Sequence, residues 1–146
     1  MVIIKPFDHS EYKRSDAKAK KIAAELFLDL YPNLTHITES ISEYAIDLEL
    51  YENYKLVGYL ETEIKYSWKG STFPFKTIQF PERKTKYLCL QFKTWFCMIN
   101  ATCTYALIVD AEDIKSSPLK MVPNKKISKG EKFFQVPLAK AAIYKL

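Results

Sequence analysis

Two consecutive segments of this chain alternate between apolar and polar residues with a period of two. They cover residues 44–51 and 56–66, and a polar stretch at residues 52–55 separates them. Because successive side chains of a strand point to opposite faces, the pattern predicts two half-buried strands joined as a hairpin. One face of the hairpin is apolar and comprises Ile46, Leu48, Leu50, Leu60, Thr62 and Ile64. The other face carries Asp47, Glu49, Tyr51, Glu61, Glu63 and Lys65.

A helix is predicted before the hairpin and further strands after it. Ser15 and Asp16 are typical of a helix start, apolar residues then recur at helical spacing, and Pro32 ends the segment. The later predicted elements are a third strand at 73–80, a short helix at 82–88, strands at 95–99 and 105–109, an edge strand at 133–137 and a terminal helix around 138–144. The core order is therefore helix, three strands, helix, two strands, in one domain spanning residues 1–146.

Composition narrows the classes of function. The chain has 146 residues, of which 48% are hydrophobic, enough for the core of one domain. Its three cysteines form no Cys-x-x-Cys pair and its two histidines lie far apart, which disfavours zinc sites, disulfide frameworks and histidine-based catalysis. Three glycines are too few for a glycine-rich phosphate loop. The formal charge of +5 favours polyanionic partners without proving one.

Hydropathy bears on the cellular location. No segment has the length and hydrophobicity of a membrane span. The apolar stretch within residues 1–6 is too short for a signal peptide. We therefore expect a cytoplasmic protein without a membrane partner.

Glu-x-Lys is the recurrent short motif of the chain. With 11 Glu and 20 Lys in the sequence, about 1.5 matches are expected by chance, and three occur. The match at Glu63-Ile64-Lys65 differs from the other two because its predicted hairpin partner carries Asp47. A hairpin that turns near Tyr54 places Asp47 opposite Glu61 and diagonal to Glu63, with Cβ atoms about 7–8 Å apart. A shift of one residue in register would remove this arrangement.

Acids that share one strand face repel each other unless a cation lies between them. Mg²⁺ accepts one or two carboxylates and keeps several waters, which suits Asp47, Glu63 and the carbonyl of Ile64, with Glu49 ranked second to Asp47. Lys65 would then lie beside the attacking water or the phosphate. The alternative is a solvated strand face on which the acids and Lys65 form weak surface pairs, worth about 0–1 kcal/mol.

The helix, the hairpin with Asp47 and Glu63-Ile64-Lys65, and the later strand, helix and strand together resemble the PD-(D/E)XK nuclease superfamily over roughly residues 15–110. The resemblance implies an α/β, restriction-endonuclease-like αβββαβ core, with a mixed central sheet flanked by helices. It also implies that Asp47 and Glu63 bind Mg²⁺ or Mn²⁺, that Lys65 serves the attacking water, and that DNA is hydrolysed to a 5′-phosphate and a 3′-hydroxyl. Ile46 stands where the family has its proline.

The resemblance also implies supporting residues. Glu25 is the candidate acid of the first helix, with a solvent-facing residue as the alternative. Gln79, Arg83, Lys84 and Lys86 correspond to the region that faces the phosphate, with a solvated amphipathic helix as the alternative. Trp68 and Lys69 belong to an aromatic and basic loop, together with Tyr66, Phe73 and Phe75, which could stack on unpaired bases or pack under the loop.

The resemblance and the size of the chain also predict partners. DNA is the expected partner, with RNA not separated from it, and a homodimer is expected because single domains of this size often act on duplexes as pairs. Lysine-rich stretches at residues 13–21 and 125–132 offer further phosphate-binding surface or simple solubility. The rival hypothesis is a nuclease-fold protein without catalysis that binds nucleic acid or serves in an assembly.

Overall fold

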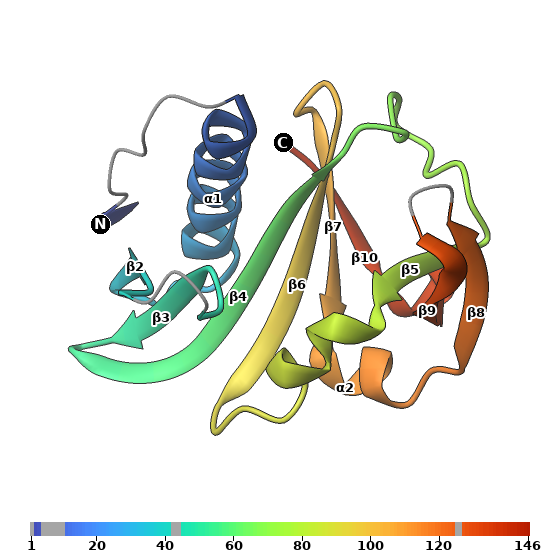
Figure 1. Cartoon of the computed structure of the whole chain (residues 1–146). Coiled ribbons are helices and arrows are strands. Elements are labelled where there is room, and N and C mark those ends of the chain that lie inside the picture. Colours follow the sequence, from blue (N-terminus) through green and yellow to red (C-terminus); the bar gives the residue numbers. More distant parts are fainter. Residues whose placement is uncertain (1, 4–10, 42–44, 125–126) are drawn as a thin grey trace.

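The computed structural model (Figure 1) describes the backbone of residues 2–3, 11–41, 45–124 and 127–146, and the side chains of residues 15–41, 45–123 and 130–146. Its helical elements are α1 (Glu11–Leu30), η1 (Glu82–Tyr87), α2 (Ala111–Lys115) and η2 (Leu138–Lys140), where η denotes a 3-10 helix. Its strands are β1 (Val2–Ile3), β2 (His36–Glu39), β3 (Leu48–Glu52), β4 (Lys55–Lys65), β5 (Thr77–Pro81), β6 (Lys93–Asn100), β7 (Tyr105–Asp110), β8 (Leu119–Asn124), β9 (Ile127–Pro137) and β10 (Ala142–Lys145).

The strands form two sheets. The large sheet has the order β1-β2-β3-β4-β6-β7-β10 and is mixed, because β4 pairs with β6 in parallel while β3 and β4 are antiparallel. The small sheet has the order β5-β9-β8 and is antiparallel. Helix α1 lies against one face of the large sheet, and the small sheet lies on the other side with η1 and α2 (Figure 1). The protein is therefore an α/β protein with a mixed sheet and few helices.

Helix α1 follows the predicted apolar spacing. Ala19, Ala23 and Phe27, four residues apart, are fully buried and face the large sheet. We call the cluster around them the helix-side core; its buried members are Ala19, Ala23, Ala24, Phe27, Ile37, Leu48, Leu50, Leu60, Cys97, Ile99, Ala106 and Ile108.

The opposite face of the large sheet packs under the small sheet. We call this cluster the small-sheet core; its buried members are Ile46, Trp68, Phe73, Ile78, Phe80, Tyr87, Leu88, Phe96, Met98, Leu107, Val109, Ala111, Ile114, Phe134 and Val136. Ile46 packs here rather than with Leu48 and Leu50, contrary to the sequence prediction. The strand begins only at Leu48, so the alternation does not extend back to Ile46.

The β3–β4 hairpin has the predicted turn. Asn53 and Tyr54 both have positive φ angles, of 48° and 69°, which a two-residue type I′ turn requires. Leu48 pairs with Leu60, and one irregularity follows between Leu50 and Tyr51. This register confirms that Asp47, one residue before Leu48, faces Glu61.

Several predicted elements differ from the structure. The predicted third strand contributes only Thr77–Pro81, which belongs to the small sheet. The strand that pairs with β3 on the side away from β4 is β2, in a segment for which no strand was predicted. The predicted second helix is the 3-10 helix η1, and the predicted terminal helix is a 3-10 turn followed by β10. The strands predicted at 95–99 and 105–109 are confirmed as β6 and β7.

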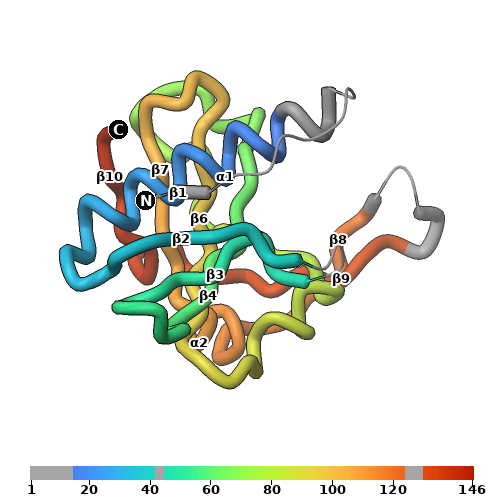
Figure 2. The backbone as a smooth tube through the Cα atoms, turned by 90° about the vertical axis from the view of Figure 1, so that its left-hand side faces the viewer, coloured from blue at the N-terminus to red at the C-terminus, as the bar shows by residue number. Residues whose placement is uncertain are grey.

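The sequence predicts a central sheet flanked by helices, but a long helix, α1, covers only one face of the large sheet. On the face opposite α1, the covering layer is the small sheet, assisted by the short elements η1 and α2. The view in Figure 2, turned by a quarter, shows β8 and β9 extending beyond the rest of the layers. The reason is that residues 111–124 and 127–137 form α2, β8 and β9. Of these, the sequence pattern indicated only the edge strand at 133–137, which is part of β9.

Candidate active site

A cleft of about 570 Å³ opens between α1 and the small sheet, over the carboxyl half of β4. Four acids and three basic residues are among the residues that line it. The lining consists of Ser15, Asp16, Ala19, Asp47, Glu61, Thr62, Glu63, Ile64, Lys65, Tyr66, Gln79, Phe80, Pro81, Arg83, Lys84, Phe96, Cys97 and Phe133. The cleft thus has a floor on β4, one wall on α1 and the other wall on the small sheet and η1.

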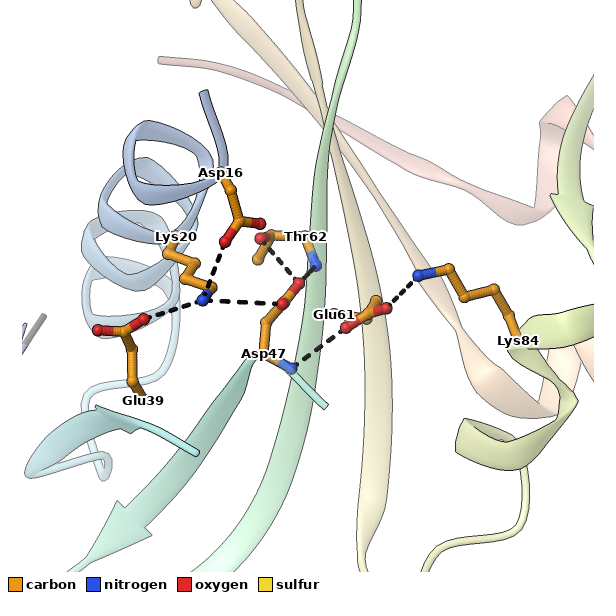
Figure 3. Close-up of polar contacts among 7 residues, drawn as sticks. All are labelled: Asp16, Lys20, Glu39, Asp47, Glu61, Thr62 and Lys84. Atoms are coloured by element: carbon orange, nitrogen blue, oxygen red, sulfur yellow. Dashed lines mark hydrogen bonds and ion pairs between the residues drawn. The ribbon is translucent and has the colours of Figure 1, made fainter. Parts of the chain in front are cut away.

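Side chains continue the pairing of the two strands where the backbone ladder stops. The backbone N–H of Thr62 donates to Asp47 Oδ2 at 2.9 Å, and Thr62 Oγ1 donates to the same oxygen at 3.2 Å. The backbone N–H of Asp47 donates to Glu61 Oε1 at 3.2 Å (Figure 3). Asp47 is therefore held on β4 although it lies outside β3, and we call this arrangement the Asp47–Glu61 clasp.

Burial and neighbouring charge perturb the acids of the cleft. Burial, followed by the charge of Glu61, raises the pKa of Asp47 to about 7, against the opposing effects of the Thr62 hydrogen bond and Lys20. Glu63 is exposed as a residue, yet the surrounding cleft walls remove part of the hydration of its carboxyl, and this desolvation raises the pKa of that carboxyl. The charges of Lys65 and Lys84 partly offset that effect. Both carboxyls are thus in an environment that disfavours negative charge.

Lys20 brings together acids from three segments. Its Nζ lies 3.0 Å from Asp16 Oδ2 on α1, 2.9 Å from Glu39 Oε1 on β2 and 4.0 Å from Asp47 Oδ1 (Figure 3). The Lys20 side chain is 8% exposed. Burial alone would lower the pKa of Lys20, but the hydrogen bonds to Glu39 and Asp16 and the nearby charges raise it overall.

Lys84 approaches the clasp from the other side of the large sheet. Its Nζ lies 2.5 Å from Glu61 Oε2, which ties η1 to the floor of the cleft (Figure 3). Desolvation lowers the pKa of Lys84, but the charge and hydrogen bond of Glu61 outweigh it and the pKa rises. The neighbouring Arg83 side chain is 72% exposed and lies 3.9 Å from Glu131 on β9.

Most residues predicted for the site meet at this cleft. The cleft lining includes Asp47, Glu63, Ile64, Lys65, Gln79, Arg83 and Lys84. Lys69 and Lys86 are exposed and lie outside the lining, and Lys86 Nζ lies 4.9 Å from the centre of the Tyr87 ring. Glu49, the second-ranked ligand, also lies outside the lining.

Two further predicted residues, Glu25 and Trp68, also lie outside the cleft lining. Glu25 is exposed on α1 and does not line the cleft; the α1 acid that does is Asp16. Trp68 is completely buried against Phe73, with ring centres 5.4 Å apart, so it packs in the core and cannot stack on bases. Its Nε1 has no hydrogen-bond partner within the part of the chain that the structure describes. Among the lysine-rich stretches, the side chains of Lys13, Arg14, Lys125, Lys126 and Lys129 fall outside the described residues.

The sequence did not single out Asp16, Lys20, Glu39 or Thr62 as members of the site. One signal was present: Asp16 and Lys20 are four residues apart on α1, and Lys20 adjoins the buried Ala19. A lysine beside the apolar stripe of a helix indicates an ion pair at the edge of the core.

The donor chemistry of the cleft limits the metals that it could hold. Within residues 15–41, 45–123 and 130–146, no group of three or more His, Cys, Asp or Glu side chains is arranged to hold a metal ion. Two carboxylates with several waters are nevertheless an arrangement that Mg²⁺ accepts. Asp47 and Glu63 are close enough for the charge of Asp47 to contribute to the raised pKa of Glu63, after desolvation and the basic residues.

Comparisons with known proteins gave no match to any protein-family model, curated protein or solved structure. Among the helices of the described chain, none combines the length and apolar character needed to cross a membrane. We therefore infer the function from the residues of the cleft.

Proposed function

We propose that the protein is a metal-dependent nuclease that hydrolyses phosphodiester bonds of DNA in the cleft over β4. The observation that carries the proposal is the position of Glu63 and Lys65, two residues apart on β4, in the same cleft as Asp47. Strand alternation puts Glu63 and Lys65 on one face, and the Asp47–Glu61 clasp holds Asp47 beside them. Two acids and a lysine are the groups that this chemistry needs.

The electrostatics support binding of a divalent cation. Burial raises the pKa of both Asp47 and Glu63, so a cation between them would relieve an environment that disfavours their charge. Asp47 and Glu63 would supply two carboxylates, and the carbonyl of Ile64 is a further oxygen in the lining. Bound Mg²⁺ or Mn²⁺ would supply charge stabilisation and a more acidic bound water.

Lys65 is the residue that we propose to act at the reacting groups. It lies in the cleft lining, and its charge lowers the pKa of Glu63 against the effect of burial, so the two side chains are near each other. A lysine there can hold the attacking water, aid its deprotonation, or stabilise the negative charge that develops on the phosphate.

The order of helices and strands also supports a nuclease of the restriction-endonuclease-like class. A helix, the antiparallel strands β2, β3 and β4, and then β6 parallel to β4 agree with the first helix, the three-strand meander and the later strand of the restriction-endonuclease-like core. The segment between β4 and β6 departs from that core, because η1 and β5 stand where a second helix is expected. The family assignment remains part of the proposal.

Cleavage assays with matched lysine variants test the proposal. The wild-type protein should cut at least one DNA in a panel of linear, nicked, branched and single-stranded substrates when Mg²⁺ or Mn²⁺ is added. Lys65→Ala should reduce cutting at least about 100-fold, because the position acts in the reaction itself. Lys55→Ala is the control, since Lys55 begins the same strand, is exposed and lies outside the cleft lining.

Two results would contradict the proposal. Equal cutting by wild type and Lys65→Ala would indicate a contaminating nuclease or another site. Metal-dependent chemistry in this cleft would be excluded if the protein cuts no DNA and calorimetry detects no Mn²⁺ binding that requires Asp47 and Glu63.

A nonenzymatic nucleic-acid-binding protein is the second candidate, and a specific observation favours it. Lys84 already forms an ion pair with Glu61, and Lys20 lies 4.0 Å from Asp47, so protein cations already accompany two acids of the cleft. This candidate predicts DNA binding that weakens steeply with added salt, without Mn²⁺ uptake.

A further inference from the structure

Aromatic side chains surround the end of the cleft at which β4 stops. Tyr66, directly after β4, lines the cleft and is 61% exposed. Phe75 is 48% exposed, and Lys65 Nζ lies 6.0 Å from the centre of its ring. Two large rings thus lie in contact with solvent beside the lysine that we assign to the reaction.

The ring of Phe75 packs against the buried ring of Phe73, which in turn contacts the buried Trp68. The Phe75 ring centre is 5.7 Å from that of Phe73, and Phe73 lies 5.4 Å from Trp68; both pairs meet edge to face. Phe73 and Trp68 are buried in the small-sheet core. Because packed rings fix each other, Phe75 is held in place although half of its surface is open.

Tyr66 is fixed in a different way. Its hydroxyl is hydrogen-bonded to Ser15 Oγ on α1, which joins the end of β4 to the opposite wall of the cleft. The ring itself remains exposed, so the hydrogen bond orients an aromatic face without covering it. A ring held beside a phosphate-binding cleft is suited to stack on a nucleic-acid base.

The depth of the cleft determines which nucleic acid can use these rings. The side chain of Asp47 is 19% exposed and that of Glu61 is 8% exposed, so these two acids lie below the rims formed by α1 and η1, whereas Glu63 is exposed. A space of about 570 Å³ is comparable to the site of one small ligand. Bases within a duplex have their faces covered by neighbouring pairs and offer nothing to an aromatic side chain.

We propose that the cleft takes a single-stranded DNA segment, with its backbone over β4 and its unpaired bases stacked on Tyr66 and Phe75. This inference relies on the proposed function only in assuming that the cleft binds a phosphodiester backbone. Lys65 and Arg83 supply positive charge for the backbone, and Lys84, which is paired with Glu61, adds its charge when it exchanges that carboxylate for a phosphate. The rings add affinity with little dependence on sequence, because every base has an aromatic face.

Equilibrium binding without metal tests the inference independently of cleavage. A fluorescent oligothymidylate of about 12 nucleotides and the matching blunt duplex are titrated with the protein in EDTA, and anisotropy is recorded. The single strand should bind at least about tenfold more tightly than the duplex. Tyr66→Ala should weaken single-strand binding about tenfold and leave duplex binding unchanged, and Phe75→Ala should act in the same direction.

Tyr54 provides the matched control. It is 92% exposed in the turn before β4, whereas Tyr66 follows the other end of the same strand. A strand of 11 residues at about 3.3 Å per residue separates them by about 35 Å. Tyr54→Ala should not change binding, and Tyr66→Phe should retain most of the affinity because it keeps the ring and loses only the hydroxyl.

The outcomes separate this inference from the proposed function. A Tyr66-dependent preference for the single strand supports the inference even if no metal-dependent cutting is found, in which case only the nuclease proposal fails. Equal or tighter binding of the duplex overturns the inference and leaves a nuclease acting on duplexes possible. Equal losses for Tyr54→Ala and Tyr66→Ala, with unchanged thermal unfolding, also overturn it.

Discussion

Lys20 and Lys84 approach the Asp47–Glu61 clasp from opposite faces of the large sheet (Figure 3). Lys20 extends from α1, lies within 4.0 Å of acids on three segments, and has a side chain that is 8% exposed. Lys84 extends from η1 and pairs with Glu61, and its side chain is 30% exposed. One clasp therefore has a buried cation on its helix side and a partly hydrated cation on its small-sheet side.

The difference in exposure indicates that Lys20 is a structural cation and that Lys84 is a cation a ligand can displace. A buried ammonium among several acids cannot leave without uncovering charge in a low-dielectric setting, so Lys20 belongs to the fold. An ammonium in contact with water loses much less when its partner changes, so Lys84 can give way to a ligand in the cleft. We therefore expect the α1 wall to be rigid and the η1 wall to respond to what the cleft binds.

The largest expected effect comes from the helix side. Lys20→Met keeps most of the side-chain volume but removes the ammonium that faces Asp16, Glu39 and Asp47. We expect the free energy of unfolding to fall by about 3 kcal/mol or more, as for other broken buried ion pairs. Urea denaturation provides the measurement, and Lys21→Met, at the exposed next position of α1, is the control. Similar losses in both variants would mean that Lys20 is no more structural than a surface lysine.

Local patterns were sufficient to predict part of the fold. Helix α1 has apolar residues at helical spacing, and strands β6 and β7 each contain a short continuous apolar run. All three were predicted near their observed positions. Strand β2 has only four residues, too few for its alternation to stand out from a loop. The assignment of β5 to the small sheet depends on its pairing with β9, more than fifty residues later, which no local pattern contains.

The contacts of the candidate site likewise comprise one that local sequence predicts and others that it does not. The register that sets Asp47 against Glu61 was predicted because it depends on a two-residue turn at Asn53 and Tyr54. The contacts of Lys20 with Glu39 and of Lys84 with Glu61 join residues 19 and 23 positions apart on different elements. They depend on how α1 and η1 pack on the sheet, and sequence spacing does not supply that information.

The second prediction concerns Asp47, which lies between the two cations. Burial and Glu61 raise its pKa from 3.8 to about 7 in the folded protein, so the folded state binds a proton that the unfolded state has released. The contribution of Asp47 to stability therefore decreases as pH rises from about 4 to about 7, with a slope of at most about 1.4 kcal/mol per pH unit. Asp47→Asn removes this contribution and should flatten the profile.

The test compares the free energy of unfolding of the wild-type protein and of Asp47→Asn at about pH 5 and about pH 6.5. The wild-type protein should lose about 2 kcal/mol more than Asp47→Asn over that interval. Glu49→Gln, two residues away and outside the cleft lining, should keep the wild-type profile. Parallel profiles for wild type and Asp47→Asn would show that the two lysines hold Asp47 ionised, and the contrast between the two sides of the clasp would then lose its electrostatic basis.

The smallest expected effect belongs to Lys84. Lys84→Met removes the bond to Glu61, and we expect a loss of about 1 kcal/mol, because the side chain is partly hydrated. Lys86→Met is a close control: both ammonium groups lie over the Tyr87 ring, at 5.5 and 4.9 Å, but only Lys84 pairs with Glu61 among the residues described. A double-mutant cycle with Glu61→Gln isolates the pair. A coupling as large as the loss from Lys20→Met would make Lys84 a structural cation, and the η1 wall would then be as rigid as the α1 wall.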